Sequence, residues 1–183
     1  AEDGIRDDLV TGVQTCALPI CTGLTLTNTG VISGLGALVK SSAGALQLTA
    51  ANTYSGGTTV NAGTVTLSGS GTLGGTSGAL TIGAGTVDLG GLTRTNGAFT
   101  LDNGTLSNGT LTASSYSLTN AGTVSAILAG NGAVTKTGAG SATLSGANTY
   151  SGGTTVNAGT LTLSGSGDRK STRLNSSHQI ISY

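Results

Sequence analysis

Apolar and small polar residues alternate over short runs along most of this chain. Within each run an apolar residue occupies every second position, and Thr, Val and Ile are frequent. A period of two with these residue types predicts β-strands that are buried on one face only. The clearest runs are LTL (24–26), LQL (46–48), VTL (65–67), LTI (80–82), VDL (87–89), FTL (99–101), YSL (116–118) and LTL (161–163).

Clusters of glycine and asparagine separate these runs, as SGG, NAG, GSG, GAG, TNG and DNG. Gly and Asn tolerate the positive φ angles that tight turns require. No long window has helical spacing, and each glycine inside a helix would cost about 1 kcal/mol. The pattern therefore predicts short strands joined by sharp corners, with essentially no helix.

A long stretch of the sequence occurs twice, at residues 41–71 and 137–167, which are 96 positions apart. Its core, NTYSGGTTVNAGT, is identical at 52–64 and 148–160, and the similarity extends upstream to an equivalent lysine pair, Lys40 and Lys136. A unit that recurs at a fixed spacing usually becomes stable by stacking on its neighbours into a solenoid. We therefore expect an elongated repeat protein.

The predicted architecture is an all-β parallel β-helix, or β-solenoid, with coils of about 20–25 residues stacked about 4.8 Å apart. Residues 21–167 would form about six to eight coils. Burial of each inward side chain would contribute about 1.5–3 kcal/mol to stability, and Val156→Asp would bury an unpaired charge. The predicted inward residues are Leu26, Leu48, Val60, Val65, Leu67, Leu80, Ile82, Val87, Leu89, Phe99, Leu101, Leu118, Val124, Leu144, Val156, Leu161 and Leu163.

Several polar and aromatic residues are expected to have structural roles. Asn52, Asn61, Asn148 and Asn157 would lie at corners and bond to their equivalents on the next coil or to local backbone. Lys40 and Lys136 are interpreted as gatekeepers against edge pairing. Tyr54 and Tyr150 would pack over the same corner of their respective coils, and sugar stacking is the less favoured interpretation of these rings.

Composition narrows the class of protein. The chain has 183 residues with 33 glycines, a single proline, 8% charged residues and a formal net charge of zero. Collagen would need glycine at every third position and much proline, and an average globular domain has about a quarter charged residues. Disordered segments combine low hydrophobicity with high net charge, whereas apolar residues recur regularly here. The chain should fold.

The two ends differ in composition from the rest. Residues 1–20 and 168–183 hold nine of the fourteen charged residues, the only proline and the only histidine, His178. Both ends resemble translated sequencing-adapter read-through, so we expect 21–167 to form the repeat body and the ends to lie outside the fold. The alternative is that they are terminal caps, which solenoids require. A Cys16–Cys21 disulfide remains an open alternative at the first boundary.

The duplicated unit resembles a known family. The stretch GAGSATLSGANTYSGGTTVNAGTLTLSGSG at 138–167, preceded by GNGAVTKT, resembles the passenger-associated β-strand repeat of bacterial autotransporters, and 79–130 resembles passenger sequence between such units. The resemblance implies a right-handed parallel β-helix that is secreted and displayed on the cell surface, attached to the bacterial outer membrane. The implied partner is the protein's own C-terminal outer-membrane β-barrel, which these residues do not include.

Candidate chemistry is sparse. GSGTLG at 69–74 matches a dinucleotide fingerprint, but it precedes a strand instead of a helix and is interpreted as a corner. Asp88, Arg94 and Asp102 could form a carboxylate pair with a cation, yet isolated solvated side chains are the expected arrangement. The body has no histidine for a Ser-His-Asp site, no His/Cys metal cluster and only three basic residues.

We therefore expect no enzyme activity, no catalytic residues, no metal, no cofactor, no small-molecule substrate and no nucleic-acid partner. The favoured function is a structural stalk of an autotransporter passenger, which would assist outer-membrane export and display a distal effector. The alternative is an adhesin or self-association surface that contacts neighbouring passengers or a host surface and causes cell aggregation.

Overall fold

The computed structural model of the chain describes residues 23–165, 172–174 and 179–182. The expected segment 1–20, the possible Cys16–Cys21 disulfide and His178 lie outside the described residues. Within the segment 168–183, the backbones of two short strands are described, and they continue the pairing of the repeat body.

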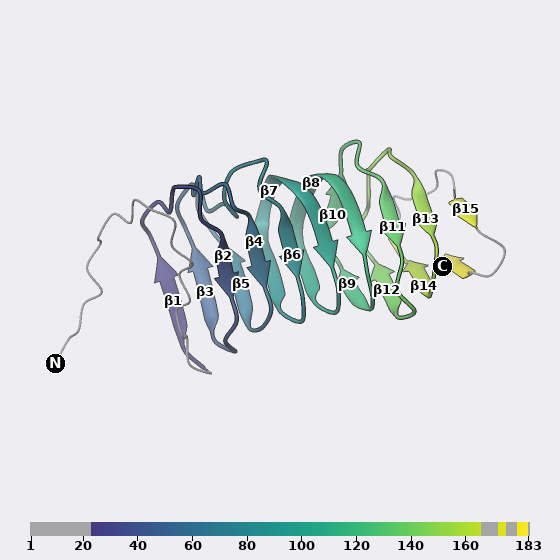
Figure 1. Cartoon of the computed structure of the whole chain (residues 1–183), viewed down its shortest axis with the longest axis horizontal. Coiled ribbons are helices and arrows are strands. Elements are labelled where there is room, and N and C mark those ends of the chain that lie inside the picture. Colours follow the sequence, from purple (N-terminus) through teal and green to yellow (C-terminus); the bar gives the residue numbers. More distant parts are fainter. Residues whose placement is uncertain (1–22, 166–171, 175–178, 183) are drawn as a thin grey trace.

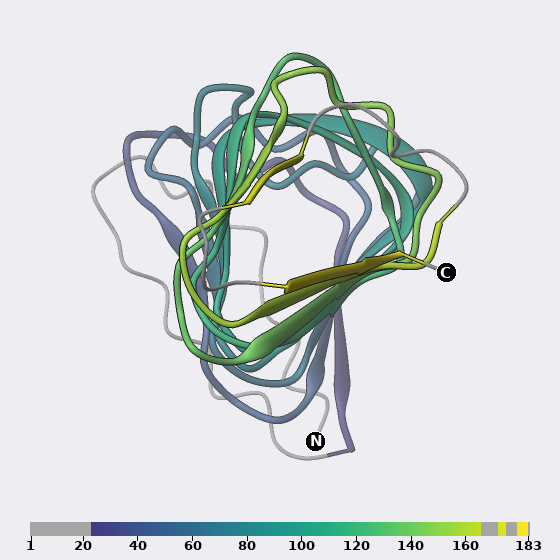
Figure 2. The same cartoon turned by 90° about the vertical axis from the view of Figure 1, so that its right-hand side faces the viewer.

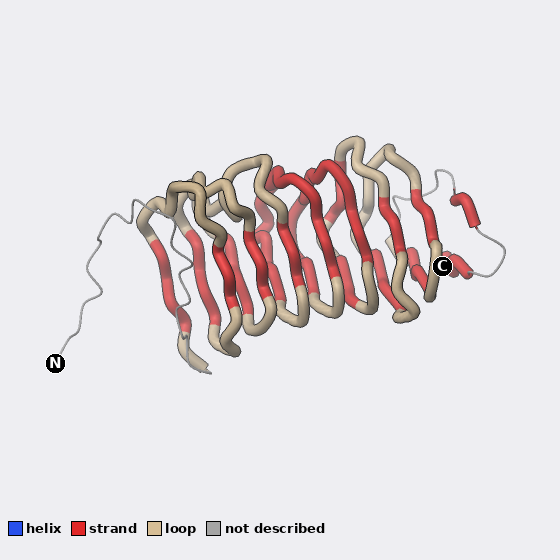
Figure 3. Tube along the Cα trace, viewed as in Figure 1, coloured by secondary structure: helices blue, strands red, loops and turns tan. Residues whose placement is uncertain are grey.

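The described residues form strands and loops without any helix (Figure 3). All strand pairs are parallel, and the strands belong to one 16-stranded sheet that winds into a β-solenoid of about 7 turns. The strands lie side by side along a rod (Figure 1), and a view along the rod shows the coils superimposed around a common axis (Figure 2). The predicted β-solenoid is therefore confirmed.

The strands are short, apart from two long ones in the middle of the rod. They are β1 (Thr25–Asn28), β2 (Leu38–Lys40), β3 (Ala45–Leu48), β4 (Thr58–Val60), β5 (Thr64–Leu67), β6 (Leu80–Ile82), β7 (Thr86–Leu101), β8 (Thr105–Leu118), β9 (Gly122–Val124), β10 (Ile127–Ala129), β11 (Val134–Lys136), β12 (Ser141–Leu144), β13 (Thr154–Val156), β14 (Thr160–Leu163), β15 (Thr172–Leu174) and β16 (Gln179–Ser182).

The number of residues in a coil is smaller than the sequence predicts. Register partners on successive coils are separated by 17 residues at Phe99 and Tyr116 and by 22 residues at Val60 and Ile82, which are the extremes. The prediction of 20–25 residues was too long because the corners are tighter than expected: between Val60 and Thr64 the chain turns within residues 61–63. The 96-residue separation of the two copies corresponds to five coils.

A single corner recurs in every coil, between a strand on one side of the rod and the next strand on the adjacent side. It reads SAG, NAG, GAG, DNG, NAG, GAG and NAG, ending at Gly44, Gly63, Gly85, Gly104, Gly122, Gly140 and Gly159. A side chain on the corner glycines from Gly63 onward would collide with the preceding coil: a Cβ on Gly104 would lie 2.4 Å from both the Gly85 carbonyl oxygen and Ile82 Cγ2. The corner therefore needs glycine for close packing of coil on coil.

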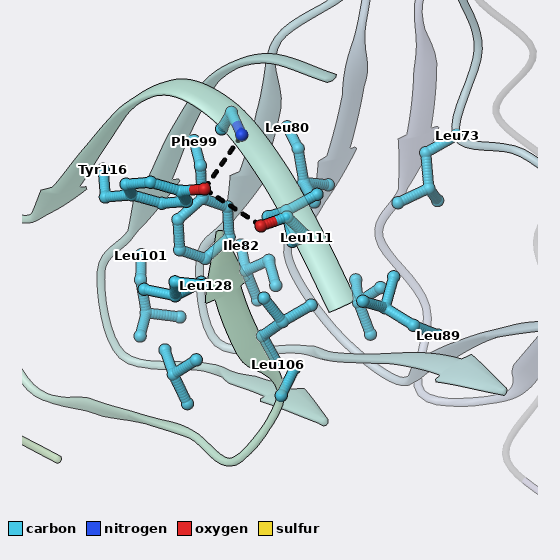
Figure 4. Close-up of a cluster of buried hydrophobic side chains, with 14 of the residues drawn as sticks. Leu73, Leu80, Ile82, Leu89, Phe99, Leu101, Leu106, Leu111, Tyr116 and Leu128 are labelled. Carbon is cyan, nitrogen blue, oxygen red and sulfur yellow. Dashed lines mark hydrogen bonds between the residues drawn. The ribbon is translucent and has the colours of Figure 1, made fainter. Parts of the chain in front are cut away.

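The core is a stack of aliphatic side chains inside the rod, of which Figure 4 shows one part. One inward column runs through Lys40, Val60, Ile82, Leu101, Leu118, Lys136 and Val156. All of the predicted inward residues are buried except Leu26, which is partly buried and packs against the core. Alternation therefore predicted the inward side chains correctly.

Hydroxyl side chains form columns on the outside. On one side of the rod Thr64, Thr86, Thr105, Thr123, Thr143 and Thr162 are successive register partners. These outward positions are neutral and β-branched, which suits a strand position that faces solvent. The predicted polar ladders are thus present.

Candidate functional site

The three charged residues that were considered as a catalytic group do not meet. The Asp88 carboxylate accepts hydrogen bonds from the Gly90 amide at 2.7 Å and from Asn108 Nδ2 at 3.1 Å. Arg94 Nε donates to the Gly71 carbonyl at 2.6 Å, and Thr119 Oγ1 donates to Asp102 at 3.0 Å. Each charged group is therefore engaged with nearby backbone or neutral polar groups, and no arrangement for general acid–base chemistry is formed by these three.

The glycine-rich segment 69–74 is a loop whose amides point to protein acceptors. The Ser70 amide donates to the Thr49 carbonyl at 3.2 Å, and the Thr72 amide donates to the Ala50 carbonyl at 3.2 Å. A phosphate cradle needs free amides at a helix N-terminus. These two amides instead join the loop to the preceding coil, which agrees with the interpretation as a corner.

The asparagine of each duplicated unit lies inside the rod and joins successive coils. Asn52 is 2% exposed; its Oδ1 accepts the Ile32 amide of the preceding coil at 2.9 Å, and its Nδ2 donates to the Thr72 carbonyl of the next coil at 3.0 Å. In the second copy Asn148 Oδ1 accepts the Leu128 amide at 2.9 Å. The prediction of bonds to equivalent asparagines or local backbone was wrong for this pair, because the partners are backbone groups of neighbouring coils.

The tyrosines make the same contact in both copies, as predicted. Tyr54 Oη lies 2.6 Å from Thr58 Oγ1, and Tyr150 Oη lies 2.7 Å from Thr154 Oγ1. Thr58 Oγ1 is also 3.1 Å from the Leu73 carbonyl oxygen of the following coil. Both rings are buried, so neither is available for stacking against a sugar.

A third buried tyrosine occupies the middle of the rod. The Tyr116 hydroxyl accepts the Ala113 amide at 2.9 Å and lies 2.9 Å from the Leu111 carbonyl oxygen (Figure 4). Its ring lies 6.1 Å from that of Phe99 and 6.0 Å from that of Tyr150, measured between centroids. The aromatic residues therefore contribute packing and anchored hydroxyls inside the core.

Burial raises the pKa of Tyr54 to about 12, although the hydrogen bond with Thr58 acts in the opposite direction. An unfolded tyrosine ionises near pH 10, so between pH 10 and 12 the unfolded state loses a proton that the folded state keeps. Stability contributed by Tyr54 should therefore be complete below pH 10 and fall by about 3 kcal/mol at most as the pH approaches and passes 12.

Urea unfolding of the chain and of Tyr54→Phe between pH 8 and 12 checks this expectation. The difference in free energy of unfolding between the two proteins should shrink above pH 10, because only the original protein carries this titrating phenol. The other titrating groups are common to both proteins and cancel. A difference that stays constant up to pH 12 would show that Tyr54 ionises alike in both states.

The equivalent lysines are buried, which corrects their interpretation as gatekeepers. Lys40 is 2% exposed and Lys136 is 0% exposed, and both lie in an inward column. Lys40 Nζ donates to the carbonyls of Ser42 and, at 3.3 Å, Ala62, while Lys136 Nζ donates to the Gly138 carbonyl. Burial lowers the pKa of both ammonium groups. A gatekeeper would project from an edge into solvent.

Two further observations concern the part of the chain that the structure describes. It contains no group of three or more His, Cys, Asp or Glu side chains placed to hold a metal ion. None of its segments is a helix long and apolar enough to cross a membrane.

Residues 38–67 and 134–166 match the family described as the passenger-associated-transport-repeat. The chain carries two passenger-associated transport repeats. The matched segments contain the pairs Lys40 and Lys136, Asn52 and Asn148, and Tyr54 and Tyr150, so the shared buried contacts coincide with the repeats. No curated protein and no solved structure matches the chain. The repeat suggests an autotransporter passenger and an extracellular or surface location.

Proposed function

We propose that this chain is a structural stalk segment of a bacterial autotransporter passenger, which assists export and holds a distal effector away from the cell. The observation that carries the proposal is the recurrence of one buried polar arrangement in two transport repeats, five coils apart in the same rod. A stalk needs a rigid rod and no reaction chemistry, so we assign the segment no enzymatic role.

The contacts between coils suit export through a narrow pore. A chain that emerges in an extended form can add one coil at a time, because each coil pairs only with its neighbours. The buried polar side chains of a repeat bond to neighbouring coils: Asn52 bonds Ile32 and Thr72, and Thr58 donates to the Leu73 carbonyl. Each docked repeat would thus oppose backward movement of the chain, and folding outside the cell would favour transport.

Export supplies the test of this proposal. The segment is placed between a secretion signal and an autotransporter barrel, and residues 38–67 and 134–166 are scrambled together. We expect a several-fold lower surface yield, measured by protease accessibility on intact cells relative to total protein. The control replaces outward threonines of the same strands, such as Thr59 and Thr155, with serine and should export normally. Equal surface yield for the scrambled and original segments would contradict the proposal.

A second candidate function is favoured by the outward threonine column from Thr64 to Thr162. Uncharged hydroxyl groups at a regular spacing could contact the same column on a neighbouring passenger, or a host surface, and so aggregate cells. The same displayed segment distinguishes the two candidates, because sedimentation of cells that do not normally clump would reveal aggregation. Dispersed cells with normal surface yield support the stalk alone.

A further inference from the structure

The corner that follows each repeat lysine is one residue longer than the corner stacked upon it. Between Lys40 and its strand partner Ala45 lie residues 41–44, whereas between Val60 and Thr64 lie residues 61–63, although Lys40 pairs with Val60 and Ala45 with Thr64. The second repeat is the same, with 137–140 stacked against 157–159. Each repeat therefore joins two corners of unequal length.

One pair of corners with equal length shows how backbone groups can pair between successive coils without a lysine. Residues 83–85 stack against residues 102–104, with Ile82 paired to Leu101 and Thr86 to Thr105. The amides of Asp102, Asn103 and Thr105 donate one by one to the carbonyls of Ile82, Gly83 and Gly85, at 2.9, 2.7 and 3.0 Å. The middle of this corner is thus tied to the next coil by a backbone amide.

The unequal corners use a different set of bonds. The amides of Asn61 and Ala62 both approach the Lys40 carbonyl, at 2.8 and 3.4 Å, and the Thr64 amide reaches the Gly44 carbonyl at 3.3 Å. In the second repeat the Asn157 and Ala158 amides converge on the Lys136 carbonyl at the same two distances. Because two amides share one carbonyl, the donors are displaced relative to the acceptors of the longer corner.

The lysine ammonium groups donate to the middle of these longer corners. Lys40 Nζ and Lys136 Nζ each bond the carbonyl two residues further along, at Ser42 and Gly138. Lys40 Nζ also donates to the Ala62 carbonyl of the next coil. A Cβ on Gly63 would lie only 2.5 Å from Lys40 Nζ. An ammonium group has three donors and needs such acceptors when it is buried.

The strand registers differ between the side of the rod before the corner and the side after it. On the side before the corner, five register steps lead from Lys40 to Lys136. These two lysines are also equivalent in the two sequence copies, 96 positions apart, so register and sequence agree on this side. On the side after the corner, five coils lead from Thr64 to Thr162, two residues past its sequence equivalent Thr160. The two sides therefore keep different registers. The two additional residues enter at the corners after Leu118 and Lys136, where 119–122 stack against 102–104 and 137–142 against 119–122, and each lysine corner then stacks against a next corner that is one residue shorter.

We propose that Lys40 and Lys136 are register-setting residues, in which a buried ammonium group donates to the middle of a four-residue corner on which the three-residue corner of the next coil stacks. The lysine thereby fixes which coil follows which, because an equal corner would leave its charge among aliphatic side chains. This role concerns the assembly of the rod and does not depend on where the protein is displayed.

A double-mutant cycle in the full 183-residue chain tests the proposal. Deleting Thr137 shortens KTGAGS (136–141) to KGAGS, and adding Lys136→Ile gives IGAGS, which matches IGAGT at 82–86 except at the last residue. We expect each single change to destabilise the protein, that is, to raise the equilibrium constant for unfolding measured in urea. The combined variant should be at least about tenfold more stable than the sum of the single effects predicts, equivalent to about 1.4 kcal/mol of coupling.

The outcome separates register setting from ordinary packing. If Lys136 only filled space, its replacement would cost the same with or without Thr137, and additive effects would overturn the proposal. Val156→Ile changes aliphatic packing in the same column and leaves the Lys136 charge in place, so it controls for packing alone. Should one single variant not fold, the recovery of a folded, urea-resistant protein on adding the second change decides the question, and its failure to recover counts against the proposal. The cycle of Lys40→Ile and deletion of Ser41 repeats the test in the first repeat.

Discussion

Ile82→Asp is expected to unfold the rod around β6, with a loss of more than about 4 kcal/mol in the free energy of unfolding. The side chain of Ile82 is fully buried, and its register partners are Val60 and Leu101. A carboxylate there would have only aliphatic neighbours in its column. Urea unfolding followed by circular dichroism measures the effect, and Thr81→Asp, which places the same charge on the outward face of the same strand, should change stability by less than about 1 kcal/mol.

Val156→Asp should be less damaging than the sequence alone predicts. Val156 belongs to the same column as Ile82, but its register partner is Lys136, which carries a buried ammonium group. An aspartate at this position would have a nearby cation, although desolvation of the pair remains costly. We expect the loss to be smaller than that of Ile82→Asp by about 1–3 kcal/mol. Equal losses for the two variants would show that Lys136 gives the new carboxylate no compensation.

Alternation and glycine spacing were enough to predict the solenoid, because both are local consequences of a coil with one buried face. The runs VTL (65–67) and LTI (80–82) form β5 and β6 with the predicted residues inside. The identical stretches at 52–64 and 148–160 also predicted that Tyr54 and Tyr150 would have the same surroundings, and their threonine contacts confirm it.

The same alternation also predicts that the two repeat lysines lie inside the rod, although their charge argues against it. In LVK (38–40) and VTK (134–136) the lysine lies two positions after an inward residue, so a strict period of two places it inside. The interpretation as a gatekeeper against edge pairing placed this lysine in solvent instead, whereas a buried ammonium group needs acceptors. The acceptor in each case is the carbonyl two residues further along the longer corner, and Lys40 also has the Ala62 carbonyl of the next coil. Neither can be recognised until the corners are aligned in register.

Coil length was less predictable because it depends on how the corner packs. Strand length and loop length can be exchanged along the sequence without changing the hydrophobic pattern, as in β7 (Thr86–Leu101), which continues around two sides of the rod. The candidate chemistry of Asp88, Arg94 and Asp102 likewise depended on which coils bring residues together. Positions 14 residues apart, such as Asp88 and Asp102, lie on different sides of a coil, whereas partners about 19 residues apart are stacked.

Gly159→Ala is the second substitution for which we expect a large loss, of about 3 kcal/mol or more. Gly159 ends the NAG corner with a φ angle of +71°, and a Cβ would lie 2.4 Å from the carbonyl oxygens of both Gly138 and Gly140. The preceding coil would have to shift its backbone, which also carries the acceptor of Lys136.

Gly153→Ala is the matched control for this prediction. Gly153 has a φ angle of +80°, but a Cβ there would meet nothing within 4 Å. The Gly153→Ala variant should be destabilised only by the backbone strain of a left-handed conformation, about 1–2 kcal/mol. Thermal and urea unfolding of both variants therefore separate strain from close packing. If the two variants lose the same stability, the corner glycines serve the turn alone, and the tight stacking of corners does not limit which residues the coil can accept.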